Sequence, residues 1–254
     1  MERISVIVVY RFDDDQIEKC IRSVQEIADE IILLDPDNRP HSKELVKIFK
    51  ICYLPDKDTA TKGLLEKAAE TADCDFLFFI WSNEYLTESL RRSIREIKAN
   101  WDKDGYRVSR LKNYYGKWMR HSGIYPDQPV RLYKKRKGHW VGDQLGEHLR
   151  LKNPESSGIL RGELYCTVFK NIQEHIMFIN QATQIAATRS FKQGKKVNSL
   201  QITFLPLKYF FNQYFIKLGI LDGFYGLTFA VLKGFSKFLE LIKLRDYIRN
   251  QVTS

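Results

Sequence analysis

The chain has 254 residues, of which 44% are hydrophobic and 28% are charged, as is typical of a globular protein with a substantial core. This composition excludes a disordered, collagen-like or coiled-coil protein. The four cysteines are far apart and form no C-x-x-C pair, so we expect neither a zinc site nor a disulfide framework. A reducing compartment is the simpler interpretation.

The formal net charge of +10 is unevenly distributed along the chain. Residues 1–100 carry 15 Lys and Arg against 20 Asp and Glu, whereas residues 101–254 carry 26 basic and 11 acidic side chains. A basic C-terminal part favours an anionic partner, such as nucleic acid, phospholipid head groups or a phosphorylated substrate. A basic surface that is merely solvated is the alternative.

The first hundred residues predict strands that alternate with helices. Residues 4–10 form an uninterrupted apolar run, which is typical of a strand covered on both faces and lacks the cleavage site of a signal peptide. A helix with apolar residues up to Val24 follows, and Asp13–Asp15 lie at the positive end of its dipole. We expect further strands at 30–35, 51–55 and 75–80, and helices at 42–50, 59–72 and 87–99. This alternation predicts a parallel α/β sheet with right-handed crossovers.

The pattern changes after residue 100. Segments 105–111, 129–134 and 138–142 are typical of strands, residues 152–158 form a polar loop, and the chain becomes helical and aromatic from about residue 170. We therefore expect one domain over residues 1–170, divided into halves 1–100 and 101–170, and a helical extension over residues 171–254.

The C-terminal extension is apolar and aromatic, but charged residues interrupt it. Lys208, Lys217 and Asp222 leave no run of the ~20 uncharged residues that would span a bilayer, and further Lys and Arg residues follow. Apolar residues beside a basic edge favour a helix lying on an anionic membrane surface. The alternative, which is compatible with the first, is that the aromatic residues pack onto the α/β domain.

Polar residues follow three of the predicted strands, at the carboxyl ends where open parallel sheets bind ligands. These segments are Tyr10–Asp13, Asp35–Asn38 and Trp81–Glu84. One interpretation is a nucleotide that lies across them, and the other is that Asp35 and Asp37 only form a turn. The absence of a G-x-G-x-x-G or Walker loop leaves a Rossmann dehydrogenase or a P-loop enzyme without support.

Six segments in this order resemble the family 2 glycosyltransferases of the GT-A fold, and especially their lipopolysaccharide core-biosynthesis glucosyltransferase branch. They are YRFDDD (10–15), LLDPDN (33–38), IWSNEYL (80–86), HSGIYPDQPVRLY (121–133), LGEHL (145–149) and LPLKYFFNQYFIKLGILDGFYG (205–226). The last segment is the most specific for that branch. The resemblance implies an α/β fold of the GT-A type, with a mostly parallel sheet and a helical C-terminal extension. It also implies an inverting transferase with a nucleotide-sugar donor, most simply a UDP-sugar.

The resemblance also implies roles for individual residues. Glu147 matches the general base that takes the proton of the acceptor hydroxyl, with His148 as a second choice, although Glu147 can also be an ordinary surface acid. Arg131 and the basic residues 134–137 can hold a diphosphate without a metal ion, or simply be solvated. The implied nucleotide-sugar contacts are Tyr10, Asp13, Asp35, Asp37, Lys62, Asn83 and Glu84, and the implied acceptor or phosphate contacts are His121, Tyr125, Asp127, Arg131 and His148.

The chain departs from the family at its D-x-D motif, whose carboxylates hold Mg²⁺ or Mn²⁺ on the diphosphate. Trp81, Ser82 and Asn83 stand at these positions, followed by Glu84. Tryptophan cannot bind a metal ion, and asparagine offers only a neutral carbonyl. We therefore expect weak affinity for a divalent cation, with Asn83 and Glu84 as its candidate ligands.

Three functions are compared on this basis. The leading hypothesis is a cytoplasmic enzyme on the inner face of the cell membrane, which transfers a hexose to a lipid-linked or lipopolysaccharide-type saccharide. The missing carboxylates favour a catalytically inactive pseudo-glycosyltransferase that acts as a binding partner, whereas Glu147 favours the enzyme. Nucleic-acid binding rests on net charge alone, without a recognisable module, so we expect no such partner.

Overall fold

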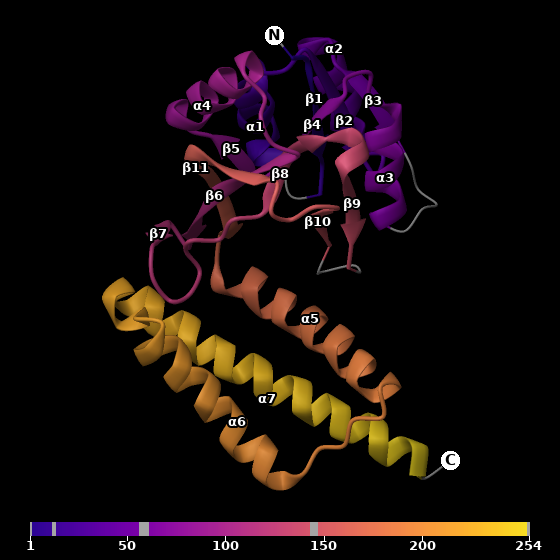
Figure 1. Cartoon of the computed structure of the whole chain (residues 1–254). Helices are drawn as coiled ribbons and strands as arrows, with labels where there is room; N and C mark the ends of the chain where they lie inside the picture. Colours follow the sequence, from indigo (N-terminus) through magenta and orange to yellow (C-terminus); the bar gives the residue numbers. More distant parts are fainter. Residues whose placement is uncertain (1, 12–13, 56–60, 143–146, 253–254) are drawn as a thin grey trace. The chain divides into compact units, whose positions relative to one another are not determined.

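A computed structural model describes residues 2–11, 14–55, 61–142 and 147–252, which form two compact units (Figure 1). Unit 1 consists of Met1–Leu111 and Pro126–Thr167, and unit 2 consists of Lys112–Tyr125 and Val168–Ser254. The division after Thr167 lies close to the expected boundary at residue 170. The assignment of residues 112–125 to the helical unit differs from the expected continuous first domain.

The elements of the first hundred residues follow the predicted alternation. The strands are β1 (Ile4–Val9), β2 (Glu30–Asp35), β3 (Cys52–Pro55), β4 (Phe76–Trp81) and β5 (Glu84–Leu86), and the helices are α1 (Ile17–Val24), α2 (Pro40–Phe49), α3 (Thr61–Thr71) and α4 (Glu88–Ala99). Every strand and helix expected in this part is confirmed, and β5 is an additional short strand. A 3-10 turn, Asp14–Gln16, precedes α1.

The later strands are longer and more numerous than expected. They are β6 (Gly105–Tyr114), β7 (Lys117–Met119), β8 (Val130–Lys134), β9 (Gly138–Val141), β10 (His148–Leu151) and β11 (Ser157–Phe169). The expected strands correspond to β6, β8 and β9, whereas β7, β10 and β11 were not expected. The strands β6 and β11 each continue from unit 1 into unit 2.

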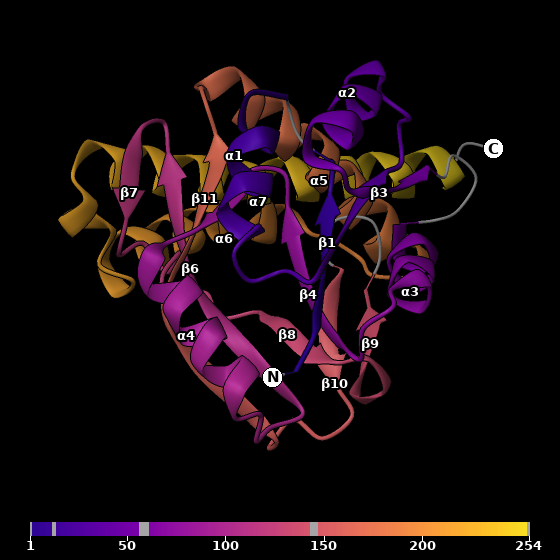
Figure 2. The ribbon, with the colours of Figure 1, turned by 90° about the horizontal axis from the view of Figure 1, so that it is seen from above.

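Among the described residues, nine strands form one mixed sheet in the order β3-β2-β1-β4-β8-β6-β11-β5, with β7 paired to β6. The four strands from β3 to β4 are parallel, and β8 and the strands after it add antiparallel pairs. β9 and β10 form a separate two-stranded ribbon (Figure 2). With its covering helices, the sheet confirms the expected α/β class, with helices at the C-terminal side of the domain's strands in sequence.

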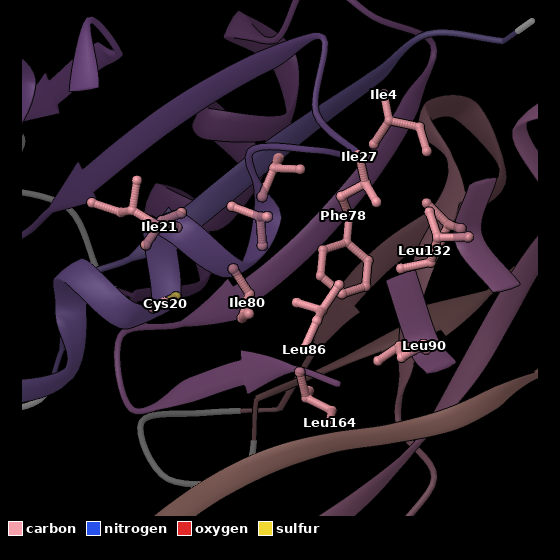
Figure 3. Packing of buried hydrophobic residues seen from close by; sticks show 14 of the residues in the cluster. Ile4, Cys20, Ile21, Ile27, Phe78, Ile80, Leu86, Leu90, Leu132 and Leu164 are labelled. Atoms are coloured by element: carbon pink, nitrogen blue, oxygen red, sulfur yellow. The ribbon is translucent and has the colours of Figure 1, made fainter. Parts of the chain in front are cut away.

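The sheet of unit 1 is covered on both faces, which explains the uninterrupted apolar run of β1. The even-numbered residues of β1 pack into a core with α1, α2 and α4. Figure 3 shows Phe78 and Ile80 of β4 with Cys20 and Ile21 of α1 in this core. The odd-numbered apolar residues of β1 pack on the other face, against α3 and Trp140 of β9. A strand without a solvent-facing side has no alternation of polar and apolar residues.

Unit 2 contains the helices α5 (Ile172–Lys192), α6 (Ser199–Phe211) and α7 (Phe224–Val252). α7 packs against both α5 and α6 (Figure 1). A π-helical turn (Asn212–Ile216) and a 3-10 turn (Gly219–Asp222) connect α6 to α7. A small core around Tyr114, Met119 and Ile124 includes Phe229 of α7. None of the helices in the described part of the chain is long and apolar enough to cross a membrane.

Two of the segments that carry the family resemblance meet around Asp222. This buried carboxylate accepts hydrogen bonds from the backbone nitrogens of Arg120 (3.4 Å) and His121 (3.2 Å) and from Ser122 Oγ (2.7 Å). The His121 ring lies against the same carboxylate, with 3.4 Å between Nδ1 and Oδ1. We call this arrangement of Asp222 with residues 120–122 the Asp222 clamp.

Glycine residues and an amide side chain complete the Asp222 clamp. The side-chain amide of Gln213 donates a hydrogen bond to the backbone oxygen of Ser122. A Cβ atom on Gly226 would lie 1.8 Å from the backbone oxygen of Gly219, so this position has no room for a side chain. The spacing of the 205–226 segment therefore serves the packing of unit 2.

Replacing Asp222 by Ala is expected to lower the free energy of unfolding by about 1–3 kcal/mol, because buried donors lose their acceptor. Asp222→Asn, which keeps one acceptor oxygen, should lose less. Urea denaturation measures both values. The matched control is Asp246→Ala on the surface of α7, where we expect a change within about 0.5 kcal/mol. Equal losses at the two positions would contradict the structural role of the clamp.

Candidate functional site

The carboxyl ends of β1 and β4 adjoin at the topological switch point of the sheet. From β1, the strand order runs to β2 and β3 on one side and to β4 on the other. Val9 is paired with Trp81, and the backbone nitrogen of Ser82 donates to the oxygen of Val9 at 3.0 Å. β2 lies on the other side of β1, where Tyr10 N donates to Leu34 O at 2.8 Å. In open α/β sheets, ligands bind beyond the carboxyl ends of the strands at such a switch point. The residues that follow β1 and β4 therefore form the candidate site.

Glu147 lies at this switch point, although it is far from β1 in sequence. Its Oε2 accepts a hydrogen bond from Arg11 Nη1 at 2.9 Å, and Arg11 is the second residue after the end of β1. The Glu147 side chain is only 3% exposed, and that of Arg11 is 31% exposed. The carboxylate is thus sheltered and paired with a cation that solvent can reach.

Sequence reasoning did not single out Arg11. It stands inside the YRFDDD segment, but the family pattern drew attention to its neighbours. A basic residue two positions after the first central strand was the available signal, because such a position lies at the ligand-binding edge of the sheet.

Asp35 is fully buried, and hydrogen bonds from three residues occupy its carboxylate. It accepts from the backbone nitrogens of Asp37 (3.1 Å) and Arg39 (2.6 Å), from Ser42 Oγ (2.6 Å) and from Arg39 Nη1 (2.9 Å). Arg39 also donates to the backbone oxygen of Tyr10 and lies over the ring of this buried tyrosine, 4.5 Å from its centre. Asp37 is exposed and forms an ion pair with Arg39. This geometry joins β2 to α2, as the turn interpretation requires.

The residues at the end of β4 form a buried ion network. Glu84, only 1% exposed, accepts from Arg110 Nη1 (3.1 Å) and Arg131 Nη2 (2.8 Å) through one oxygen, and from the backbone nitrogen of Trp81 (3.0 Å) through the other. Arg110 also forms an ion pair with Asp127, with 2.6 Å between Arg110 Nη2 and Asp127 Oδ2. Burial lowers the pKa of Arg131 to about 10, an effect that Glu84 opposes, so its guanidinium stays charged at neutral pH. This guanidinium lies 3.8 Å from the ring centre of Trp81.

The donor set at this position does not fit a divalent cation. Magnesium requires several oxygen ligands that face the ion, but both oxygens of Glu84 already accept hydrogen bonds. Asn83 turns its amide nitrogen to the backbone oxygen of Thr167, at 2.7 Å. Among the described residues, no group of three His, Cys, Asp or Glu side chains can hold a metal ion.

The remaining predicted site residues are divided between the two units. In unit 1, His148 is the exposed first residue of β10. Lys62 lies in the first turn of α3, but its side chain is outside the described residues, as is the whole of Asp13. In unit 2, His121 joins the Asp222 clamp, and the Tyr125 ring lies 5.4 Å from the guanidinium of Arg120. Of the predicted contacts, unit 1 brings Glu84, Asp127 and Arg131 together in its buried ion network.

Comparison with curated proteins finds relatives along nearly the whole chain. An uncharacterized glycosyltransferase of Rickettsia typhi is 22% identical, over 97% of this chain and 88% of its own length. One of Rickettsia prowazekii is 23% identical, with the same two coverages. These relatives bear out the expectation of a glycosyltransferase enzyme. No family model matches the chain.

Comparison with solved structures finds weaker similarity. TarS of S. aureus, residues 1–349, has a TM-score of 0.47 and 12% identity, over 98% of this chain and 92% of that chain. Its complex with UDP-GlcNAc has a TM-score of 0.49 at the same identity and coverage. A nucleotidyl transferase of Methanothermobacter has a TM-score of 0.36, over 51% of this chain and 70% of that chain.

Proposed function

We propose that this protein is an inverting glycosyltransferase that moves a hexose from a nucleotide sugar, most simply a UDP-sugar, to a hydroxyl of a lipid-linked or lipopolysaccharide-type saccharide. The position of Glu147 carries this proposal. Its carboxylate lies at the end of β1 beside Arg11, where the sheet offers its ligand-binding edge. The family resemblance implies the base role for this glutamate, and the Rickettsia glycosyltransferases add support along the chain.

The reaction needs a base on the acceptor side. The acceptor hydroxyl attacks the anomeric carbon as the bond from that carbon to the diphosphate breaks, and the bonding electrons leave with the diphosphate. Glu147 takes the proton of the hydroxyl as the new carbon–oxygen bond forms. The low exposure of its side chain limits competition from bulk water for the same position.

The second candidate function is that of a catalytically inactive pseudo-glycosyltransferase, which binds but does not transfer a sugar. The ion network around Glu84 favours it, because a carboxylate that accepts hydrogen bonds through both oxygens cannot ligate a metal ion on a donor. Incubation with a membrane extract and a panel of nucleotide sugars tests both candidates. Transfer of one sugar into lipid supports the enzyme. Nucleotide binding without transfer from any donor would favour the inactive candidate.

We also propose that unit 2 holds the protein on an anionic membrane surface, at the inner face of the cell membrane. Unit 2 carries 15 Lys and Arg against four Asp and Glu, so the positive charge of the chain resides there. A surface that is apolar and positive fits an anionic leaflet. A nucleic-acid partner would account for the positive charge of unit 2 but not for its exposed apolar side chains. These exposed side chains near the α6–α7 connection are Phe204, Leu207, Phe211, Phe215, Ile216, Leu218, Ile220, Leu221 and Phe224.

We expect the protein to sediment with vesicles that contain phosphatidylglycerol, and less so at high salt or with phosphatidylcholine alone. Ile216 and Phe224 are 79% and 75% exposed, and replacing both by Ser should weaken vesicle binding at least about tenfold. Ile48→Ser, at an exposed position on α2 of unit 1, is the matched control. Unchanged binding of the double variant would exclude the α6–α7 connection as the membrane contact.

A further inference from the structure

The candidate site contains a cation that solvent can reach, although its described side chains do not fit a metal ion. A departing nucleoside diphosphate is strongly anionic, and its departure is faster when a fixed positive charge lies beside it. Arg11 is the second residue after β1 at the switch point, and solvent reaches its side chain. A guanidinium can bind two phosphate oxygens at once, which makes it suited to this task.

Two other arginines near the ends of these strands already have structural partners. Arg131 is buried and donates to Glu84. Arg39 donates to Asp35 and to the backbone of Tyr10, so moving it would open the end of β2. Arg11 is different, because its carboxylate partner is the proposed catalytic base itself.

We propose that Arg11 binds the donor diphosphate in place of a divalent cation, and that its move from Glu147 to the phosphate frees Glu147 to act as the base. This inference rests on the proposed function. Before the donor binds, Arg11 neutralises a sheltered carboxylate that would otherwise be costly to keep charged. After it binds, the phosphate oxygens compete for the guanidinium, and Glu147 faces the acceptor hydroxyl without its cation.

The exchange fixes an order of events in which charges and protons balance. The donor binds first, because the acceptor needs an available base. Glu147 takes the proton of the hydroxyl, the sugar forms its new bond, and the nucleoside diphosphate leaves with the electrons of the broken bond. Glu147 then returns its proton to water, and Arg11 pairs with it again.

Calorimetry with UDP as the probe tests the role of Arg11 directly. We expect the wild-type affinity for UDP to change less than about threefold when EDTA replaces Mn²⁺. Arg11→Ala should weaken UDP binding about 10- to 100-fold, as expected for a charge-assisted hydrogen-bonded pair, and leave uridine binding unchanged. Arg11→Lys should lose less. Arg22→Ala, at an exposed site on α1, is the matched control.

Arg11→Ala removes the cation that pairs with Glu147, so the comparison is repeated in a Glu147→Gln background, where the charge of Glu147 is absent. The same loss of UDP affinity is expected there. Binding that requires Mn²⁺ and is insensitive to Arg11→Ala would overturn the role of Arg11 while nucleotide binding stands. If neither UDP nor any UDP-sugar binds the wild type, the proposed function itself fails.

Discussion

Replacing Glu147 by Gln is expected to reduce sugar transfer by about 10²- to 10⁴-fold, the usual contribution of a general base. Glutamine preserves the size of the side chain but cannot take the proton of the acceptor hydroxyl. The variant should bind UDP at least as tightly as the wild type, because the guanidinium of Arg11 no longer has to leave the negative charge of Glu147. Initial rates with a labelled nucleotide sugar measure the first effect, and calorimetry measures the second.

His148 provides the matched control for Glu147. It is the next residue and is exposed, and His148→Asn should alter the rate less than about threefold if Glu147 is the base. The reverse result, with activity lost in His148→Asn and kept in Glu147→Gln, would assign the base to the histidine. Loss in both variants with weakened UDP binding would instead indicate damage to the ribbon of β9 and β10.

Replacing Glu84 by Ala is expected to lower the free energy of unfolding by about 3–5 kcal/mol, because removing one partner of a buried ion pair leaves an uncompensated charge. Arg131 is almost completely buried and would lose its carboxylate, while Arg110 would keep Asp127. Urea denaturation measures the loss. Glu84→Gln retains an acceptor oxygen and should be intermediate.

The control for Glu84 is Glu88→Ala, which removes an exposed carboxylate of α4 that pairs with Arg91 and Arg95. Exposed ion pairs contribute about 0–1 kcal/mol, so the change there should be small. The same denaturation experiments with Mn²⁺ or EDTA test whether Glu84 binds a metal ion. A stabilisation of the wild type by Mn²⁺ that Glu84→Gln abolishes would show that Glu84 is a ligand after all.

The parallel part of the fold could be predicted because its strands are buried on both faces. The apolar runs of β1, β2 and β4 are continuous, and the helices between them have amphipathic spacing. β11 was missed although it has 13 residues, because most of its side chains are only half-buried and the sequence SGILRGELYCTVF mixes glycine, charged and apolar residues. Short strands such as β5 and β7 offer too few residues for a period to appear.

The candidate site could be predicted only in part, because several of its contacts join residues that are far apart in the sequence. Local sequence indicated the turn at Asp35, because its partners lie within seven residues. The pairing of Arg11 with Glu147 joins residues 136 positions apart, and that of Glu84 with Arg131 joins residues 47 apart. Such contacts depend on the strand order of the sheet, which a single sequence does not reveal.

The helical unit is built from two separate stretches of the polypeptide. Residues 112–125 supply Tyr114, Met119 and Ile124 to its core and the backbone donors that Asp222 accepts. A truncated gene product that ended before α5 would therefore expose these apolar residues in the middle of the chain. A fragment starting at Val168 would lack the donors for its own buried carboxylate. Gain or loss of this unit by recombination at the codons for residues 168–254 would therefore require a second change at the codons for residues 112–125.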